Sequence, residues 1–217
     1  MNKREKRERM LEVIERLKCV YPNAECALEF GGDPWKLLVM GRLSAQCTDK
    51  RVNEVSKDLF RAFPTAADMA YGDLGTIEDI VKPCGLYRMK AANIKDASRM
   101  LVEEFGGQLP GTMEELLRFP GVGRKIANLL LGDIFAKPAI VCDTHMMRIC
   151  ARLGMYPESL KDPTKIEFIL RDIGPAEEGS DLCHRVVLFG RDTCSARSPL
   201  CTGCPLSDIC EHLRRAK

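Results

Sequence analysis

The sequence predicts an all-α protein of about ten helices joined by short loops. Apolar residues recur at helical spacing along most of the chain, helix-capping residues precede the apolar runs, and no segment shows convincing strand alternation. The 217 residues suffice for one large domain or two small ones. Because no repeat or low-complexity linker marks a boundary, domain limits must come from motifs.

Helix starts in the first half of the chain carry local signals. Residues 1–20 form a charged amphipathic segment. Asp33 before Pro34 predicts an N-cap with proline at the first helical position. Thr48 and Thr65 can cap the next two helices. The helices predicted here cover 34–46, 49–63, 66–72 and 87–105.

Capping signals continue in the second half. Thr112 and Glu115 form a capping-box pattern before a short helix that stops at Pro120. Asp143 can cap the helix that follows it, and Asp162–Pro163 repeats the cap-proline signal. The helices predicted here cover 113–119, 126–135, 144–154, 163–174 and 182–190.

Composition excludes a membrane-spanning or secreted protein. The chain is 45% hydrophobic and 29% charged, and no uncharged run approaches the ~18 residues that cross a bilayer. Residues 1–20 lack the apolar core and small-residue cleavage site of a secretory signal. We therefore expect a cytoplasmic location and no membrane partner.

Charge is clustered locally, although the net charge is only +2. Residues 118–128 carry three basic side chains and no acid, whereas residues 158–178 hold six acids and three bases. One face is thus expected to suit phosphates. Residues 1–20 hold seven Lys/Arg and four Glu, which fits either that face or a solvated helix with i,i+4 ion pairs.

The eleven cysteines indicate metal binding more than disulfides in a cytosolic protein. Seven are scattered singly, mostly among apolar neighbours, and are expected to be small core residues. The other four, Cys194, Cys201, Cys204 and Cys210, have the spacing Cx6Cx2Cx5C. Four thiolates this close predict a closed four-sulfur site, and the spacing alone leaves zinc and a cubane iron-sulfur cluster open.

Residues 119–128, FPGVGRKIAN, lie between a short capped helix and an apolar helix. Glycines at 121 and 123 permit a tight turn that leaves amides exposed at a helix N-terminus, where phosphate is favoured. This helix-hairpin-helix would grip a DNA backbone without reading sequence. Taken alone, the GVG turn also fits a plain interhelical connection.

Five segments together carry a family resemblance: LSAQCTD (43–49), CGLYRMKAANI (84–94), FPGVGRKIAN (119–128), VCDTH (141–145) and the four-cysteine terminus. In order and spacing the chain resembles the endonuclease III family, bifunctional DNA glycosylases and AP lyases of the helix-hairpin-helix superfamily. The resemblance implies a [4Fe-4S] cluster on the four cysteines and oxidised pyrimidines in double-stranded DNA as substrate. It also implies a six-helix barrel lobe at 23–134 and a cluster lobe formed by 1–22 and 135–217.

The resemblance further implies Lys125 as nucleophile and Asp143 as catalytic carboxylate. A nucleophilic lysine must be a neutral amine, and both the helix N-terminus and neighbouring Arg124 disfavour its protonation. Asp143 would stabilise an oxocarbenium-like sugar and move protons without a tight ion pair to Lys125. The alternatives are an exposed helix lysine and a simple N-cap.

Phosphate contacts are expected from Gly121, Val122, Gly123 and Arg124. A glycosylase must also flip its target nucleotide and fill the gap left in the duplex. The resemblance assigns that role to Gln46, Leu86 and His145, and Asp49 is a candidate for recognising the flipped base. Gln46 could instead be a helix-end polar residue, Leu86 a core contact and His145 a first-turn histidine.

Two other functions remain open at the level of sequence. Adenine-removing glycosylases of the superfamily share the cluster, but they lack a lysine at the position of Lys125 and carry a further C-terminal domain, whereas this chain ends seven residues after Cys210. A non-catalytic DNA-binding iron-sulfur protein would need neither Lys125 nor Asp143. The favoured expectation is a monomeric repair glycosylase with lyase activity.

Overall fold

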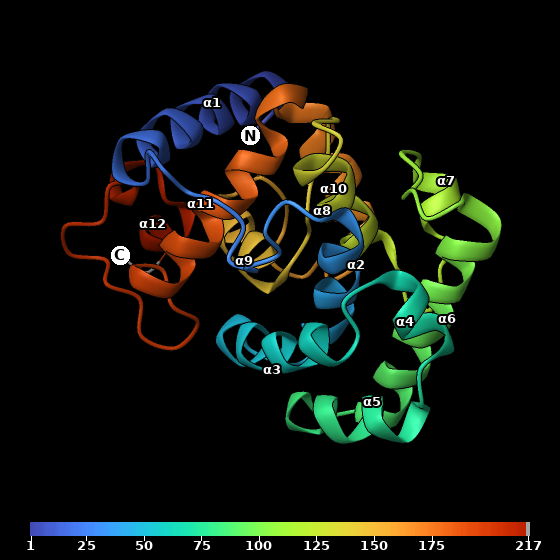
Figure 1. Cartoon of the computed structure of the whole chain (residues 1–217). Coiled ribbons are helices and arrows are strands. Elements are labelled where there is room, and N and C mark those ends of the chain that lie inside the picture. The colour runs from blue at the N-terminus through green and yellow to red at the C-terminus, as the bar shows by residue number, and fades with distance from the viewer. Residues whose placement is uncertain (216–217) are drawn as a thin grey trace. The chain divides into compact units, whose positions relative to one another are not determined.

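A computed structural model describes residues 1–215, and these residues form an all-helical fold (Figure 1). They contain twelve α-helices, three short 3-10 helices and no strand. The predicted all-α class is therefore confirmed. Within the same residues, no helix is long and apolar enough to cross a membrane.

The chain divides into two compact units. Unit 2 is the continuous stretch Ala27–Ala136, and unit 1 joins Met1–Cys26 to the segment from Lys137 onward. Unit 2 contains α2 (Pro34–Leu43), α3 (Asp49–Ala62), α4 (Ala66–Tyr71), α5 (Leu74–Val81), η1 (Lys82–Cys84), α6 (Tyr87–Phe105), α7 (Met113–Leu116) and α8 (Arg124–Asp133). Unit 1 contains α1 (Lys3–Val20), α9 (Thr144–Arg152), α10 (Pro163–Ile173), η2 (Ala176–Glu178), α11 (Gly179–Asp192), η3 (Ser207–Ile209) and α12 (Glu211–Arg215).

The predicted caps explain where most helices begin. Asp33 accepts hydrogen bonds from the backbone N–H groups of Trp35 and Lys36, and Thr48 accepts one from Arg51. The helix predicted at 87–105 is found with those bounds and ends at Gly106, which takes a left-handed conformation. The sequence reading missed α5, which Asp73 caps through its bond with the Thr76 N–H.

Helices α2 and α6 form the centre of unit 2. Every residue of α2 from Leu37 to Leu43 is buried, and Arg42 is the one charged residue in this otherwise apolar stretch. At one end of the pair, the Trp35 indole Nε1 donates to Ser98 Oγ of α6 over 2.9 Å. The two helices are thus joined by polar bonds as well as by packing.

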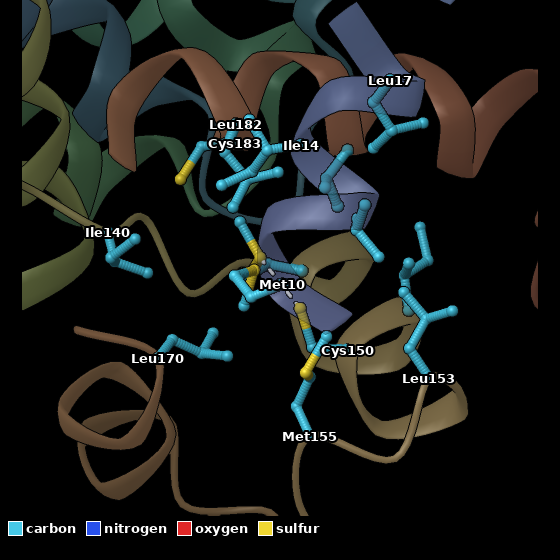
Figure 2. Close-up of a cluster of buried hydrophobic side chains, with 14 of the residues drawn as sticks. Met10, Ile14, Leu17, Ile140, Cys150, Leu153, Met155, Leu170, Leu182 and Cys183 are labelled. Carbon is cyan, nitrogen blue, oxygen red and sulfur yellow. Dashed lines mark hydrogen bonds between the residues drawn. The ribbon is translucent and has the colours of Figure 1, made fainter. Parts of the chain in front are cut away.

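Unit 1 has its own core, in which α1 packs against the C-terminal helices (Figure 2). Met10, Ile14 and Leu17 project from one face of α1 and are at most 2% exposed. They meet Leu153 beyond α9 and Leu182 of α11 in the same cluster. Burial of this apolar face is what attaches the N-terminal helix to the distant C-terminal segment.

The opposite face of α1 carries ion pairs, as one of the two sequence interpretations expected. Arg4 pairs with Glu8 and Arg16 with Glu12 at i,i+4 spacing, and Lys18 reaches Glu178 of η2. The structure therefore favours the solvated, ion-paired helix for the N-terminal charges.

The seven scattered cysteines are only partly core residues. Cys84, Cys150 and Cys183 are buried, whereas Cys19 at the end of α1 is exposed. The remaining three are half-buried: Cys26, Cys47 and Cys142. The expectation of core packing is correct for the buried three and wrong for Cys19, because α1 turns that position away from its apolar face.

Candidate functional site

The helix-hairpin-helix consists of α7, α8 and the turn between them. Phe119 anchors the turn because it is buried and its ring stacks on Phe105 of α6 at a centroid distance of 5.2 Å. The Val122 N–H donates to the Phe119 carbonyl over 3.0 Å and closes the turn. Gly123 is the N-cap of α8 and has no side chain to satisfy the first-turn amides. These amides remain available to an anion at the positive end of the helix.

Gly121 is required by both conformation and space. Its φ is +77°, a region that residues with a Cβ rarely adopt. A Cβ at this position would lie 2.7 Å from Asn93 Oδ1 and closer still to Arg42 Nε. Arg42 Nε itself donates to Asn93 Oδ1 over 2.9 Å, so the hairpin rests on a fixed polar contact between α2 and α6.

Lys125 is the second residue of α8 and is exposed. Within residues 1–215 its side chain makes no hydrogen bond or ion pair. The amine is therefore accessible to a ligand held at the hairpin amides. Nearby Arg124 is half-buried at the same helix start.

Asp143 is the N-cap of α9, and its Oδ1 accepts a hydrogen bond from the Met146 N–H over 2.7 Å. The capping interpretation is therefore correct in geometry. It does not exclude a catalytic role, because the cap engages only one carboxylate oxygen. Asp143 belongs to unit 1, whereas Lys125 belongs to unit 2.

Gln46 and Leu86 lie in loops of unit 2 and share an unusual backbone conformation. Gln46 follows α2 with a φ of +54°, and Leu86 precedes α6 with a φ of +47°. Both side chains are exposed, and Leu86 keeps 49% of its surface exposed despite being apolar. The left-handed region costs a non-glycine residue about 1 kcal/mol or more, and such strain often marks functional positions. Leu86 is thus not the core contact that was its alternative interpretation.

Asp49 and His145 lie at helix starts. Asp49 is the first residue of α3 and is half-buried. His145, in the first turn of α9, has its Nδ1 3.2 Å from Arg148 Nη2. Its ring packs so closely on Gly190 that a Cβ there would lie 3.0 Å from His145 Cγ. The orientation of this imidazole is therefore fixed by its neighbours in unit 1.

The four C-terminal cysteines line one pocket. Burial raises the pKa of the Cys204 thiol, and electrostatic repulsion from the three other cysteines raises it further. The four sulfurs therefore influence one another. Yet among residues 1–215 no three His, Cys, Asp or Glu side chains converge closely enough to share a single metal ion. A donor set of four sulfurs suits an iron-sulfur cluster or a zinc ion.

Two arginines of α9 hold the cysteine loop, and the sequence reading did not single them out. Arg152 Nη1 donates to Cys194 Sγ over 3.1 Å and to the Ser195 carbonyl over 2.8 Å. Arg148 Nη2 donates to the Cys194 carbonyl over 2.9 Å. Their i,i+4 spacing on α9 could have indicated a shared role, because it places both guanidinium groups on one helix face.

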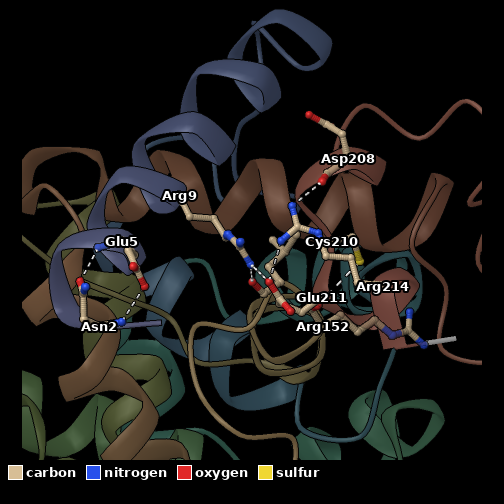
Figure 3. A network of polar contacts seen from close by, with 9 residues as sticks. Asn2, Glu5, Arg9, Arg152, Asp208, Cys210, Glu211 and Arg214 are labelled. Atoms are coloured by element: carbon tan, nitrogen blue, oxygen red, sulfur yellow. Dashed lines mark hydrogen bonds and ion pairs between the residues drawn. The ribbon is translucent and has the colours of Figure 1, made fainter. Parts of the chain in front are cut away.

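The loop is also tied to α1 (Figure 3). Arg9 of α1 pairs with Glu211 over 2.8 Å. Arg16 of the same helix pairs with Asp208. Arg16 holds the pKa of the Asp208 carboxyl below its usual value, and Arg9 does the same for Glu211. The first and last helices of the chain thus stabilise the segment that carries the four cysteines.

Comparison with known proteins identifies the family of this arrangement. The family described as HhH-GPD superfamily base excision DNA repair protein matches residues 39–176, and the iron-sulfur binding domain of endonuclease III matches residues 194–210. Endonuclease III of Synechocystis sp. is 43% identical over 206 residues, which cover 94% of this chain and 93% of the relative. The chain belongs to the endonuclease III family. Endonuclease III of Bacillus subtilis is 40% identical, covering 92% of this chain and 90% of the relative.

Solved endonuclease III structures share the whole fold. A non-covalent endonuclease III–DNA complex superposes with a TM-score of 0.91 at 36% identity, covering 100% of this chain and 98% of that chain. A trapped endonuclease III–DNA covalent intermediate superposes with a TM-score of 0.90 at 37% identity and full coverage of both chains. This endonuclease III family member is a base-excision-repair DNA glycosylase and AP lyase with a [4Fe-4S] cluster. The non-catalytic alternative is thereby excluded.

Proposed function

We propose that this enzyme removes oxidised pyrimidines from double-stranded DNA and cleaves the strand through a Schiff base on Lys125. The observation that carries the proposal is the accessibility of the Lys125 amine. It is exposed and makes no hydrogen bond or ion pair within residues 1–215, and it follows directly on the phosphate-binding hairpin. A nucleophile must reach a substrate atom, and an exposed amine without an intramolecular partner can do so.

In the first step, neutral Lys125 Nζ attacks C1′ of the flipped nucleotide. The glycosidic C–N bond breaks, and the base leaves with the bonding electrons and takes up a proton. Asp143 stabilises positive charge on the sugar as that bond breaks and accepts a proton from the new secondary amine. The C1′–O4′ bond then breaks, O4′ keeps its electrons and takes the proton back from Asp143, and the nitrogen lone pair forms an iminium ion on Lys125.

In the second step, removal of a C2′ proton allows the 3′ C–O bond to break. The 3′ phosphate leaves with the electrons of that bond, and the strand is cut. Water then adds to the iminium carbon, and hydrolysis returns Lys125 as a free amine. Removal of the C2′ proton needs a base, and Asp143 is the candidate for it.

Contacts with DNA are assigned to three groups of residues. The hairpin, with Gly121, Val122, Gly123 and Arg124, binds phosphates through backbone amides and one guanidinium group. The exposed Gln46 and Leu86 enter the gap left by the flipped nucleotide, Gln by hydrogen bonding to the orphaned base and Leu by wedging between base steps. The two further assignments are His145 for the same gap and Asp49 for the flipped base.

The cluster would be held by Cys194, Cys201, Cys204 and Cys210, whose sulfur-only donor set and shared pocket fit it. When bound, it supplies structural cross-linking of a loop too polar to fold by burial alone. The chain's own residues then act without it in the chemical steps above. We further propose that the enzyme works as a monomer in the cytoplasm, with the hairpin in a barrel lobe and the cluster in a second lobe.

Borohydride trapping on a duplex with one oxidised pyrimidine tests the proposal. The wild-type chain should give a covalent protein–DNA adduct, and Lys125→Gln should give none while retaining damaged-DNA binding. Lys165→Gln, which changes an exposed lysine of α10, is the matched control and should trap normally. An adduct formed by Lys125→Gln, or release of adenine in place of the oxidised pyrimidine, would overturn the proposal.

A further inference from the structure

Lys90 of α6 is completely buried, at 0% exposure. Lysine is almost never fully buried without partners, since desolvation of an ammonium group is costly. Here the Lys90 Nζ donates to the Leu43 carbonyl and to the Cys84 carbonyl, each over 2.7 Å. Burial lowers the pKa of the Lys90 amine. The two carbonyls thus receive a donor from the centre of unit 2.

Each of these two carbonyls belongs to the last residue of a helical element. The loops that carry Gln46 and Leu86 follow directly after those elements. Leu43 is the last residue of α2, and Gln46 follows three residues later. Cys84 is the last residue of η1, and Leu86 follows two residues later. A carbonyl at a helix end has no partner within its own helix, so each needs an outside donor when it is buried. A single ammonium group satisfies both.

The same residue also fixes Leu86 through the backbone. The Lys90 N–H donates to the Leu86 carbonyl over 3.0 Å, which starts α6 directly after the left-handed residue. The two loops also meet through their thiols. Burial, followed by the neighbouring Cys47 thiol, raises the pKa of Cys84 to about 12. The loops carrying Gln46 and Leu86 are therefore one assembly, and Lys90 is the residue that contacts both of its helix ends.

We propose that Lys90 is a positioning residue for nucleotide flipping, which holds the Gln46 loop and the Leu86 loop in one fixed arrangement so that both side chains enter the duplex together. This inference rests on the flipping role proposed for those two residues. Both hold a φ near +50°, which an unsupported loop would relax. Binding energy can unstack and flip a nucleotide only if the Gln46 and Leu86 side chains are already correctly placed when the enzyme binds DNA.

The test compares Lys90→Met, which keeps an unbranched apolar side chain and removes the donors, with Ser98→Ala. The control is matched because Ser98 is also fully buried on α6 and also bonds to α2, through Trp35, but at the end away from both loops. Flipping is followed by stopped-flow fluorescence of 2-aminopurine placed opposite the lesion. Lys90→Met should lower the flipping amplitude and kcat/KM on a base lesion at least tenfold. Ser98→Ala should stay within twofold of wild type, and binding of undamaged duplex should stay within twofold for both.

A double-mutant background separates positioning from general stability. In the Gln46→Ala/Leu86→Ala chain, Lys90→Met should reduce flipping less than twofold further, because the residues it positions are gone. An equal tenfold loss in both backgrounds, or an equal loss in Ser98→Ala per folded molecule, would overturn the inference. If Lys90→Met does not fold, Lys90→Gln, which can still donate to one carbonyl, should give an intermediate loss, and unchanged flipping would overturn the inference. If the wild-type chain traps on borohydride but gives no flipping signal that depends on Gln46 and Leu86, the proposed flipping role fails instead.

Discussion

Replacing Asp143 by asparagine separates the two roles that this residue can have. The structure gives Asp143 one hydrogen bond, from the Met146 N–H to Oδ1 at 2.7 Å, which caps α9. Asparagine offers the same acceptor and is an equally good N-cap, so the free energy of unfolding should change by less than about 0.5 kcal/mol. Alanine removes the acceptor and should cost about 1 kcal/mol, or roughly 2–4 °C in the unfolding midpoint.

In catalysis, by contrast, asparagine should behave like alanine and not like aspartate. If the carboxylate charge stabilises the transition state by about 3 kcal/mol, both Asp143→Asn and Asp143→Ala lose at least roughly 100-fold in single-turnover base release. On a pre-formed abasic site, which needs no base expulsion, Asp143→Asn should retain a larger share of its strand-cleaving activity. Thermal unfolding and single-turnover assays on the same preparations measure both quantities. Loss of stability in Asp143→Asn, with normal activity per folded molecule, would refute the reasoning and leave Asp143 as a cap only.

Three further predictions concern the cluster, the hairpin and pH. Cys201→Ser should abolish the yellow-brown colour and lower the soluble yield, because cluster binding is coupled to folding of the loop; a colourless wild-type protein with stoichiometric zinc would contradict this. Gly121→Val should weaken binding to all duplexes alike, and wild-type affinity should fall steeply with salt; a flat salt dependence would exclude phosphate binding by the hairpin. Arg16 lowers the pKa of Asp208, and Arg9 lowers that of Glu211. These ion pairs therefore stabilise the fold above the carboxyl pKa of the unfolded chain, about 4, and lose that contribution as the pH falls below it. The drop in denaturation midpoint from pH 6 to pH 3 should be smaller in Arg16→Met than in the wild-type chain.

Local chemistry explains which parts of the fold could be predicted from the sequence. Helix starts at Asp33, Thr48 and Asp162 were predictable because each cap acts on amides two or three residues away. The positive φ angles of Gln46 and Leu86 were not, since neither residue type favours that region and tertiary contacts impose it.

Lys90 was missed for a different reason. Its position is four residues before buried Ile94 and eight before buried Ser98, so the helical period did place it on the buried face of α6. A lysine is ordinarily exposed, so the residue type alone argues against burial at this position. The two carbonyls that make its burial possible belong to segments six and 47 residues away in the chain, which no local pattern reveals.

The most direct test of the central claim is to locate the covalent bond. A borohydride-trapped complex on a duplex with one oxidised pyrimidine is digested with nuclease and protease, and the modified peptide is sequenced by mass spectrometry. The account predicts the reduced sugar adduct on the Nζ of Lys125, since only this amine is proposed to attack C1′. An adduct on the N-terminal amine or on any other lysine would contradict it.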